Sequence, residues 1–129
     1  MKFYTIDANH LCRPCFNLRD FAVWMKANQT TCRVDFFLCE AYTISTVFLG
    51  LDHNHSGVGD PLLFETMIFL PDKTIGAIAR YCTWAEAVAG HERIDSMLAR
   101  EHADAHALTI KTLRFMVASP DPLSDPYKK

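Results

Sequence analysis

Two histidines and two aspartates lie close together in the stretch LDHNHSGVGD, between two apolar runs. Imidazole and carboxylate groups are the side chains that most often serve as general acids and bases and as ligands of divalent metals. Glu65 adds a carboxylate in the middle of the second apolar run, where a buried charge needs a partner. Asp52, His53, His55 and Glu65 are therefore candidates for an acid–base or metal site. The alternative is a polar turn beside one hydrogen-bonded carboxylate that fixes the pairing of the strands.

Glu65 has candidate partners in His53, Arg80 and His91. His91 falls on the apolar stripe of an expected helix, and Asp95 lies one turn further on. A lone histidine on an apolar stripe more often makes a structural hydrogen bond than it does chemistry. Both roles remain open for His91.

Cys12 and Cys15 in CRPC have the spacing of a zinc knuckle or of a redox pair. Cys32, Cys39 or His10 would have to complete a zinc site, and the second tight cysteine pair of such sites is missing. Cys15 also precedes an expected helix, whose N-terminus would lower the pKa of its thiol. Zinc stays an alternative to reduced, mostly buried thiols, which are typical of an intracellular chain.

A second pair, His102 and His106, is four residues apart, so a helix would place both rings on one face that can hold a metal. The glutamate of a zinc-protease motif is absent beside them, and an exposed polar face is the alternative. The chain also has no phosphate-binding glycine loop and no G-x-S-x-G motif.

The elements that must position these residues follow from periodicity and capping. Asn17 is the expected N-cap of a first helix. Thr83 and Glu86 form a capping-box pattern at the start of a second helix, in which Gly90 indicates close packing on a neighbour. Pro14 predicts that CRPC is a turn. The expected helices span 18–27, from after Thr83 to about 102, and about 105–117, with one long helix over the last two as the alternative. The expected strands span 2–6, 41–52, 61–69 and 77–82, with 33–39 undecided.

Helices and strands are segregated along the chain, which predicts an α+β fold: an antiparallel sheet of three to five strands with two or three helices packed on one face. One domain is expected over residues 1–118 and a mobile tail over 119–129. If the central hairpin closes symmetrically around Gly57, Leu49 lies opposite Glu65 and Asp52 lies near Leu62.

Bulk properties exclude some classes of protein. The 129 residues carry a net charge of −2, so the chain as a whole has no basic surplus for nucleic acid. No apolar run has the roughly 20 residues of a membrane-spanning helix. The first residues, MKFYTIDANHL, do not form the apolar core of a signal peptide. We therefore expect a cytoplasmic protein that uses neither nucleic acid nor a membrane.

The segment ISTVFLGLDHNHSGVGDPLLFETMIF, followed by RYCTWAEAVAGHERI, resembles a family of small uncharacterised proteins of bacteriophages, prophages and some bacteria. The upstream PCFNLRDFAVWM is similar to the first helix of that family, and the likeness covers residues 14–94. The resemblance implies a phage-type setting in the bacterial cytosol. The family's motif includes Cys15 but not Cys12, which weakens the zinc hypothesis. It also includes Ser45, Asp52, His53, Glu65, Thr66 and His91.

Three functions are consistent with these residues. The leading hypothesis is an accessory protein, not an enzyme, that binds a bacterial host protein such as a defence or regulatory factor. The first alternative is a small metal-dependent hydrolase or nucleotide-processing enzyme that uses Asp52, His53 and Glu65, with His91 nearby. The second alternative is a structural component of the virion. Homo-oligomers are compatible with all three.

Overall fold

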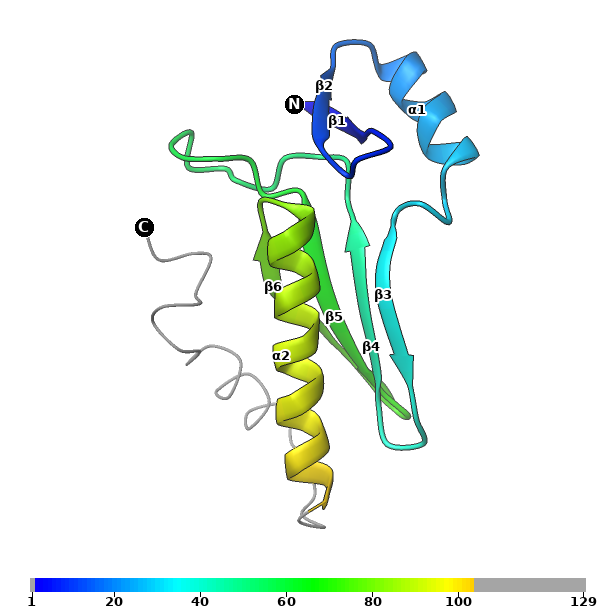
Figure 1. The fold of residues 1–129 in the computed structure, drawn as a ribbon, viewed down its shortest axis with the longest axis vertical. Helices are drawn as coiled ribbons and strands as arrows, with labels where there is room; N and C mark the ends of the chain where they lie inside the picture. Colours follow the sequence, from blue (N-terminus) through cyan, green and yellow to red (C-terminus); the bar gives the residue numbers. More distant parts are fainter. Residues whose placement is uncertain (1, 104–129) are drawn as a thin grey trace.

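The structure is a computed structural model, and it describes residues 2–103. The elements of these residues are, in chain order, β1 (Phe3–Ile6), β2 (Cys12–Cys15), α1 (Leu18–Ala27), β3 (Arg33–Leu38), β4 (Thr43–Phe48), β5 (Phe64–Leu70), β6 (Lys73–Tyr81) and α2 (Trp84–Ala103). The α+β class is confirmed (Figure 1). The expected helix over 105–117 and the expected tail lie outside the described residues.

Strands β3 to β6 form one antiparallel sheet in the order β3-β4-β5-β6, so each strand pairs with its neighbour in sequence. Alternation along β4 buries Ile44, Thr46 and Phe48 beneath α2 and leaves the residues between them half-buried on the opposite face. The undecided segment 33–39 is thus an edge strand. The last strand is longer than predicted, because only Pro71 and Asp72 form the turn before it.

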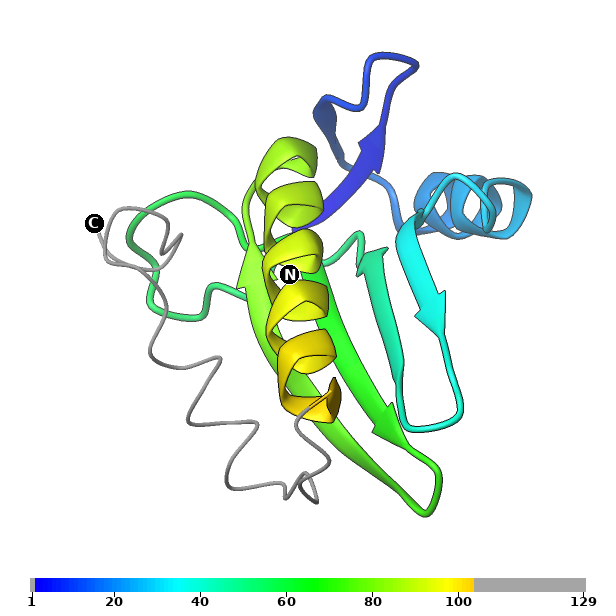
Figure 2. The same ribbon diagram turned by 60° about the horizontal axis from the view of Figure 1, so that its bottom comes forward.

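Helix α2 lies across one face of this sheet and contacts all four strands (Figure 2). Its start is as predicted: Oγ1 of Thr83 accepts the N–H of Glu86 at 3.1 Å, and the hydroxyl donates to Oε1 of Glu86 at 3.1 Å. Gly90 confirms the predicted close packing, because the ring of Tyr81 occupies the space that a β-carbon at Gly90 would take.

The first two strands and α1 form a unit of their own, which we call the N-terminal lobe (residues 2–27). β1 and β2 pair as an antiparallel ribbon, and α1 packs mainly on this ribbon (Figure 1). The ring of Trp24 on α1 also meets that of Phe48 on β4 edge to face, with 6.0 Å between centroids. Asn17 caps α1 as predicted, because its Oδ1 accepts the amides of Arg19 at 2.8 Å and Asp20 at 3.2 Å. The ring of Phe3 on β1 stacks on that of Phe21 on α1, with 5.0 Å between centroids.

The predicted turn at CRPC is wrong, because these four residues are strand β2. Pro14 is tolerated there for a geometric reason. It lies opposite Tyr4, whose amide donates to the Gly50 carbonyl at 2.8 Å, on the side of β1 away from β2. At that position of an antiparallel pair the backbone groups do not bond across the pair, so the missing N–H of a proline costs no ladder bond.

The hydrophobic core lies between α2 and the sheet and reaches into the N-terminal lobe. It includes Ile6, Ile44, Phe48, Leu63, Phe64, Ile68, Tyr81, Ala87, Ile94 and Leu98. None of the described helices is long and apolar enough to cross a membrane.

Candidate functional site

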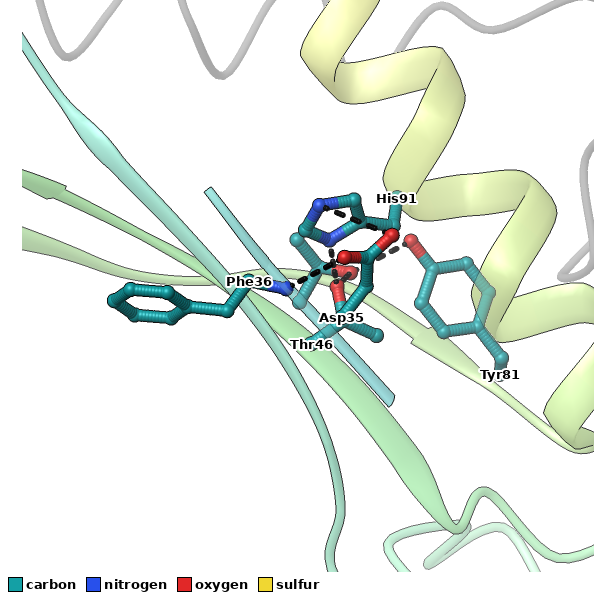
Figure 3. A network of polar contacts seen from close by, with 6 residues as sticks. Asp35, Phe36, Thr46, Tyr81 and His91 are labelled. Atoms are coloured by element: carbon teal, nitrogen blue, oxygen red, sulfur yellow. Dashed lines mark hydrogen bonds and ion pairs between the residues drawn. The ribbon is translucent and has the colours of Figure 1, made fainter. Parts of the chain in front are cut away.

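A chain of buried polar groups joins α2 to the sheet around His91 (Figure 3). Nδ1 of His91 lies 2.8 Å from Oγ1 of Thr46, which lies 2.7 Å from Oγ1 of Thr66. The Thr66 hydroxyl lies 3.0 Å from the hydroxyl of Tyr81. At the outer end, Nε2 of His91 lies 3.7 Å from Oδ2 of Asp35. The chain therefore runs from β6 through β5 and β4 to α2, and ends at a carboxylate on β3.

The Asp35 carboxylate favours the imidazole tautomer with its proton on Nε2, because that N–H then faces the negative charge. Nδ1 is then free to accept the Thr46 hydroxyl proton. The Thr46 oxygen accepts from Thr66, and the Thr66 oxygen accepts from Tyr81. The three hydroxyls and Nδ1 of His91 are all hydrogen-bonded in this arrangement, as buried polar groups require, and Nε2 faces the Asp35 carboxylate at 3.7 Å.

Carboxylate, imidazole and hydroxyl in this order are also the groups that activate a nucleophile in hydrolases. The hydroxyls here cannot reach a substrate, because Thr46 and Thr66 have no solvent-exposed surface. Only the Asp35 end is open, with 46% of its side chain exposed. Burial also raises the pKa of the Tyr81 phenol, which keeps that hydroxyl a neutral donor. The geometry thus fits a structural role, in which these hydrogen bonds hold α2 against the sheet.

Glu65 lies on the face of the sheet opposite to the polar groups of His91, Thr46, Thr66 and Tyr81. It pairs with Val47 on β4 and Arg80 on β6, and its Oε2 accepts the Nε–H of Arg80 at 3.0 Å. The side chains of Glu65 and Arg80 are 10% and 37% exposed. Arg80, of the three candidates, is therefore the partner of Glu65. His91 and Glu65 cannot act on one substrate, because the sheet separates them.

The central hairpin does not close symmetrically. The predicted pairing of Leu49 with Glu65 is wrong by two residues, since Val47 occupies that position and the Leu49 amide donates to the Leu63 carbonyl at 2.7 Å. The shift arises between Leu49 and Asp52, where Gly50 has a positive φ of 78° and its carbonyl accepts the amide of Tyr4 on β1 at 2.8 Å.

Asp52 is close to Leu62, as predicted. Its Oδ1 accepts the amides of Asn54 at 2.8 Å and Leu62 at 3.1 Å, so this carboxylate holds the base of the loop. Nδ1 of His53 lies 2.9 Å from the Leu51 carbonyl, and the His55 ring lies 6.2 Å from that of His53. Asp52, His53, Glu65 and His91 thus have separate partners and do not converge.

The cysteine candidates are also apart. Cys12 faces the core and Cys15 lies three positions along the same strand, on the other face of the ribbon. Among residues 2–103, no group of three or more histidine, cysteine or acidic side chains is placed to hold a metal ion. His102 is in the last turn of α2 and His106 lies outside the described residues, so their prediction is untested.

His10, a candidate zinc ligand, packs instead on the first residue of α2. Its ring lies parallel to that of Trp84, with 3.7 Å between centroids and 7° between planes. His10 adopts a positive φ of 63° at the turn of the β1–β2 ribbon, and the Oδ1 of Asp7 accepts the amides of Asn9 and Leu11 there. This stacking ties the N-terminal lobe to α2.

The N-terminal lobe contains a second candidate site, which the sequence did not suggest. A cavity of about 370 Å³ lies beside β1 and β2, lined by Lys2, Phe3, Tyr4, Pro14, Cys15 and Phe16. Phe16 is 95% exposed. Its backbone is nevertheless held, because Cys15 Sγ donates to the Asn17 carbonyl at 3.6 Å and Asn17 caps α1. One signal was available: Phe16 is an aromatic residue outside the apolar stripe of α1.

Comparisons of the chain with models of protein families, with curated proteins and with solved structures find no significant match. The candidate sites therefore rest on the geometry of this chain alone.

Proposed function

We propose that this protein acts by binding another protein through its N-terminal lobe, and that the partner is a protein of the bacterial cell in which a phage-type accessory protein works. The observation that carries the proposal is Phe16, an almost fully exposed aromatic side chain that lines a mostly apolar cavity. Large aromatic side chains dominate the binding energy of protein interfaces, and because the backbone around Phe16 is held, binding has to order only its side chain.

The surroundings of Phe16 support a protein as the ligand. Of the large hydrophobic side chains that are exposed in the described residues, Leu11, Phe16, Leu18 and Val23 belong to the N-terminal lobe. Such a concentration of apolar surface on a small unit is typical of interaction sites. The bacterial setting follows from the sequence resemblance.

The alternative of a metal-dependent hydrolase has no support in the geometry, because its candidate residues lie on both faces of the sheet and in a separate loop. The alternatives of a virion component and of a homo-oligomer stay predictions. The face of the sheet opposite α2, where Phe36 and Leu38 of β3 are exposed, is the surface on which a second copy would be sought.

A site-specific cross-link tests the proposal. A photo-reactive phenylalanine analogue replaces Phe16, or Val58 as a control, and the full chain is irradiated inside a bacterial host cell. Val58 is also apolar and is 78% exposed, but it lies in the loop after β4. We expect one defined adduct from position 16 and none from position 58. Identical adducts from both positions would contradict the proposal.

Affinity then separates a true interface from chance proximity. The cross-linked partner is purified and its Kd for the full chain is measured by calorimetry. We expect Phe16→Ser to weaken binding by about tenfold or more, as for a central aromatic anchor, and Val58→Ser to leave it unchanged. Equal affinity of wild type and Phe16→Ser would show that the lobe is not the binding surface.

A further inference from the structure

The N-terminal lobe differs in charge from the rest of the described chain. Residues 2–27 contain the basic side chains Lys2, Arg13, Arg19 and Lys26 and the acidic side chains Asp7 and Asp20. Residues 28–103 contain five basic and ten acidic side chains. The small lobe is thus the positive end of a molecule whose larger part is negative.

The positive charge of the lobe is available to a ligand. Arg13 is neutralised within the lobe, because its Nε–H donates to Oδ2 of Asp7 at 3.0 Å. Lys2 and Arg19 have no ion pair with any residue between 2 and 103. Lys2 lines the cavity, and Arg19 lies in the first turn of α1, three residues after Phe16. Lys2 can therefore face a ligand bound beside Phe16, and Arg19 adds positive charge to the same end of the lobe.

We infer that the cavity beside Phe16 takes an acidic segment of the partner protein, which inserts one aromatic or aliphatic side chain and places its carboxylates toward Lys2 and Arg19. This inference rests on the proposed protein-binding function of the lobe. Apolar lining explains the inserted side chain, and the charge segregation selects acidic flanks, because like charges at an interface are strongly disfavoured. A basic segment is repelled here and attracted to the remainder of the molecule.

The cavity volume of about 370 Å³ agrees with this occupant. It is at the small end of the roughly 300–1,000 Å³ of ligand sites, and Lys2 is the one charged side chain in its mostly apolar lining. A single anchoring side chain with flanking charges needs no more than this.

Fluorescence anisotropy with labelled peptides tests the inference on the full chain. The probes are a short peptide with phenylalanine between glutamates, the same peptide with alanine for phenylalanine, and the same peptide with lysines for the glutamates. We expect binding of the first, at least about fivefold weaker binding of the second, and none of the third. Affinity for the first should fall as salt is raised above about 0.1 M.

Variants locate the binding. Lys2→Glu and Phe16→Ala should each weaken the acidic peptide by about fivefold or more, and both positions lie at the surface of the fold. Arg100→Glu, at an exposed position in α2, changes charge equally and should have no effect. Circular dichroism confirms that each variant is folded.

The outcomes distinguish this inference from the proposed function. Tighter binding of the lysine peptide, or equal effects of Lys2→Glu and Arg100→Glu, overturns the acidic segment but leaves an interface at Phe16 intact if the cross-link is found. Tighter binding of single-stranded oligodeoxythymidine than of the acidic peptide also overturns it and assigns nucleic acid, whose bases stack on aromatic side chains. Absence of both the cross-link and peptide binding overturns the proposed function as well.

Discussion

Nδ1 of His91 on α2 lies 2.8 Å from Oγ1 of Thr46 on β4, and neither residue is more than 2% exposed. Apolar packing between a helix and a sheet tolerates small sliding movements, whereas a hydrogen bond in the interior does not. The bond therefore sets the position of α2 along β4. Thr66 and Tyr81 extend the same constraint to the next two strands.

Thr46→Val tests this role, because valine keeps the shape of threonine and removes the hydroxyl. The imidazole of His91 then loses a buried partner, and we expect a loss of about 1–3 kcal/mol in the free energy of unfolding, measured with urea. Thr43→Val, on the half-buried opposite face of β4, is the matched control and should change stability by less than about 0.5 kcal/mol. Equal effects at both positions would show that the hydroxyl of Thr46 contributes nothing.

Gly90 and Tyr81 give a second test of the packing of α2. Alanine favours a helix over glycine by about 1 kcal/mol, so Gly90→Ala would stabilise a free helix. Here the added β-carbon meets the Tyr81 ring, and we expect a net loss of about 1–3 kcal/mol in urea unfolding. Ser96→Ala, exposed on the same helix, serves as control and should be neutral or slightly stabilising. A more stable Gly90→Ala variant would contradict the close contact.

Local signals in the sequence predicted the elements well. Asn17 and Thr83 mark the two helix starts correctly, because an N-cap depends on neighbours within three residues. Pro14 led to the wrong prediction of a turn. Its place in a strand is possible because Tyr4, which lies opposite it, donates its amide to Gly50, and Gly50 is far away in sequence. Only the tertiary structure shows that a backbone N–H at position 14 would point away from β1, so that a proline loses no hydrogen bond there.

The candidate site was predicted less well, for a similar reason. A structural hydrogen bond was one of the two roles left open for His91, and the structure shows such a bond to Thr46. Its neighbour Asp35 belongs to a strand whose type the sequence left open. Successive side chains of β5 point to opposite faces of the sheet. The partners of Glu65, and its position relative to His91, therefore depend on the register in which β5 pairs with its neighbours. A shift of pairing by two residues keeps the faces but changes every partner.

In the ion pair of Glu65 and Arg80, removal of the arginine should cost more stability than removal of the glutamate. Arg80→Met leaves a carboxylate that is 10% exposed without its cation, whereas Glu65→Gln leaves an arginine that is 37% exposed to water. We therefore expect Arg80→Met to cost more stability, on the order of 1–3 kcal/mol after allowance for the partial exposure of Arg80. The double variant Glu65→Leu with Arg80→Met should recover part of that loss, and the single variants Glu65→Leu and Arg80→Met complete the double-mutant cycle. A strictly additive cycle would contradict a direct interaction.

Cys12 should make stability depend on pH in alkaline solution. Burial, assisted by the nearby Asp7 carboxylate and the Cys82 thiol, raises the pKa of Cys12 from 9.0 to about 11. The unfolded chain therefore loses this proton at a lower pH than the folded chain does. The stabilisation is complete below about pH 9 and is lost as the pH rises through about 11, because the unfolded state binds fewer protons in that window.

Urea unfolding of the wild type and of Cys12→Ala between pH 8 and about 11, under reducing conditions, measures this contribution. The variant loses some packing at every pH, which shifts its curve by a constant amount. We expect the wild type to lose stability more steeply than Cys12→Ala above about pH 9, so that the two curves approach each other. Parallel curves over the whole range would show that the Cys12 thiol ionises at the same pH in the folded and unfolded chains, and hence that β2 does not hold this side chain against the core.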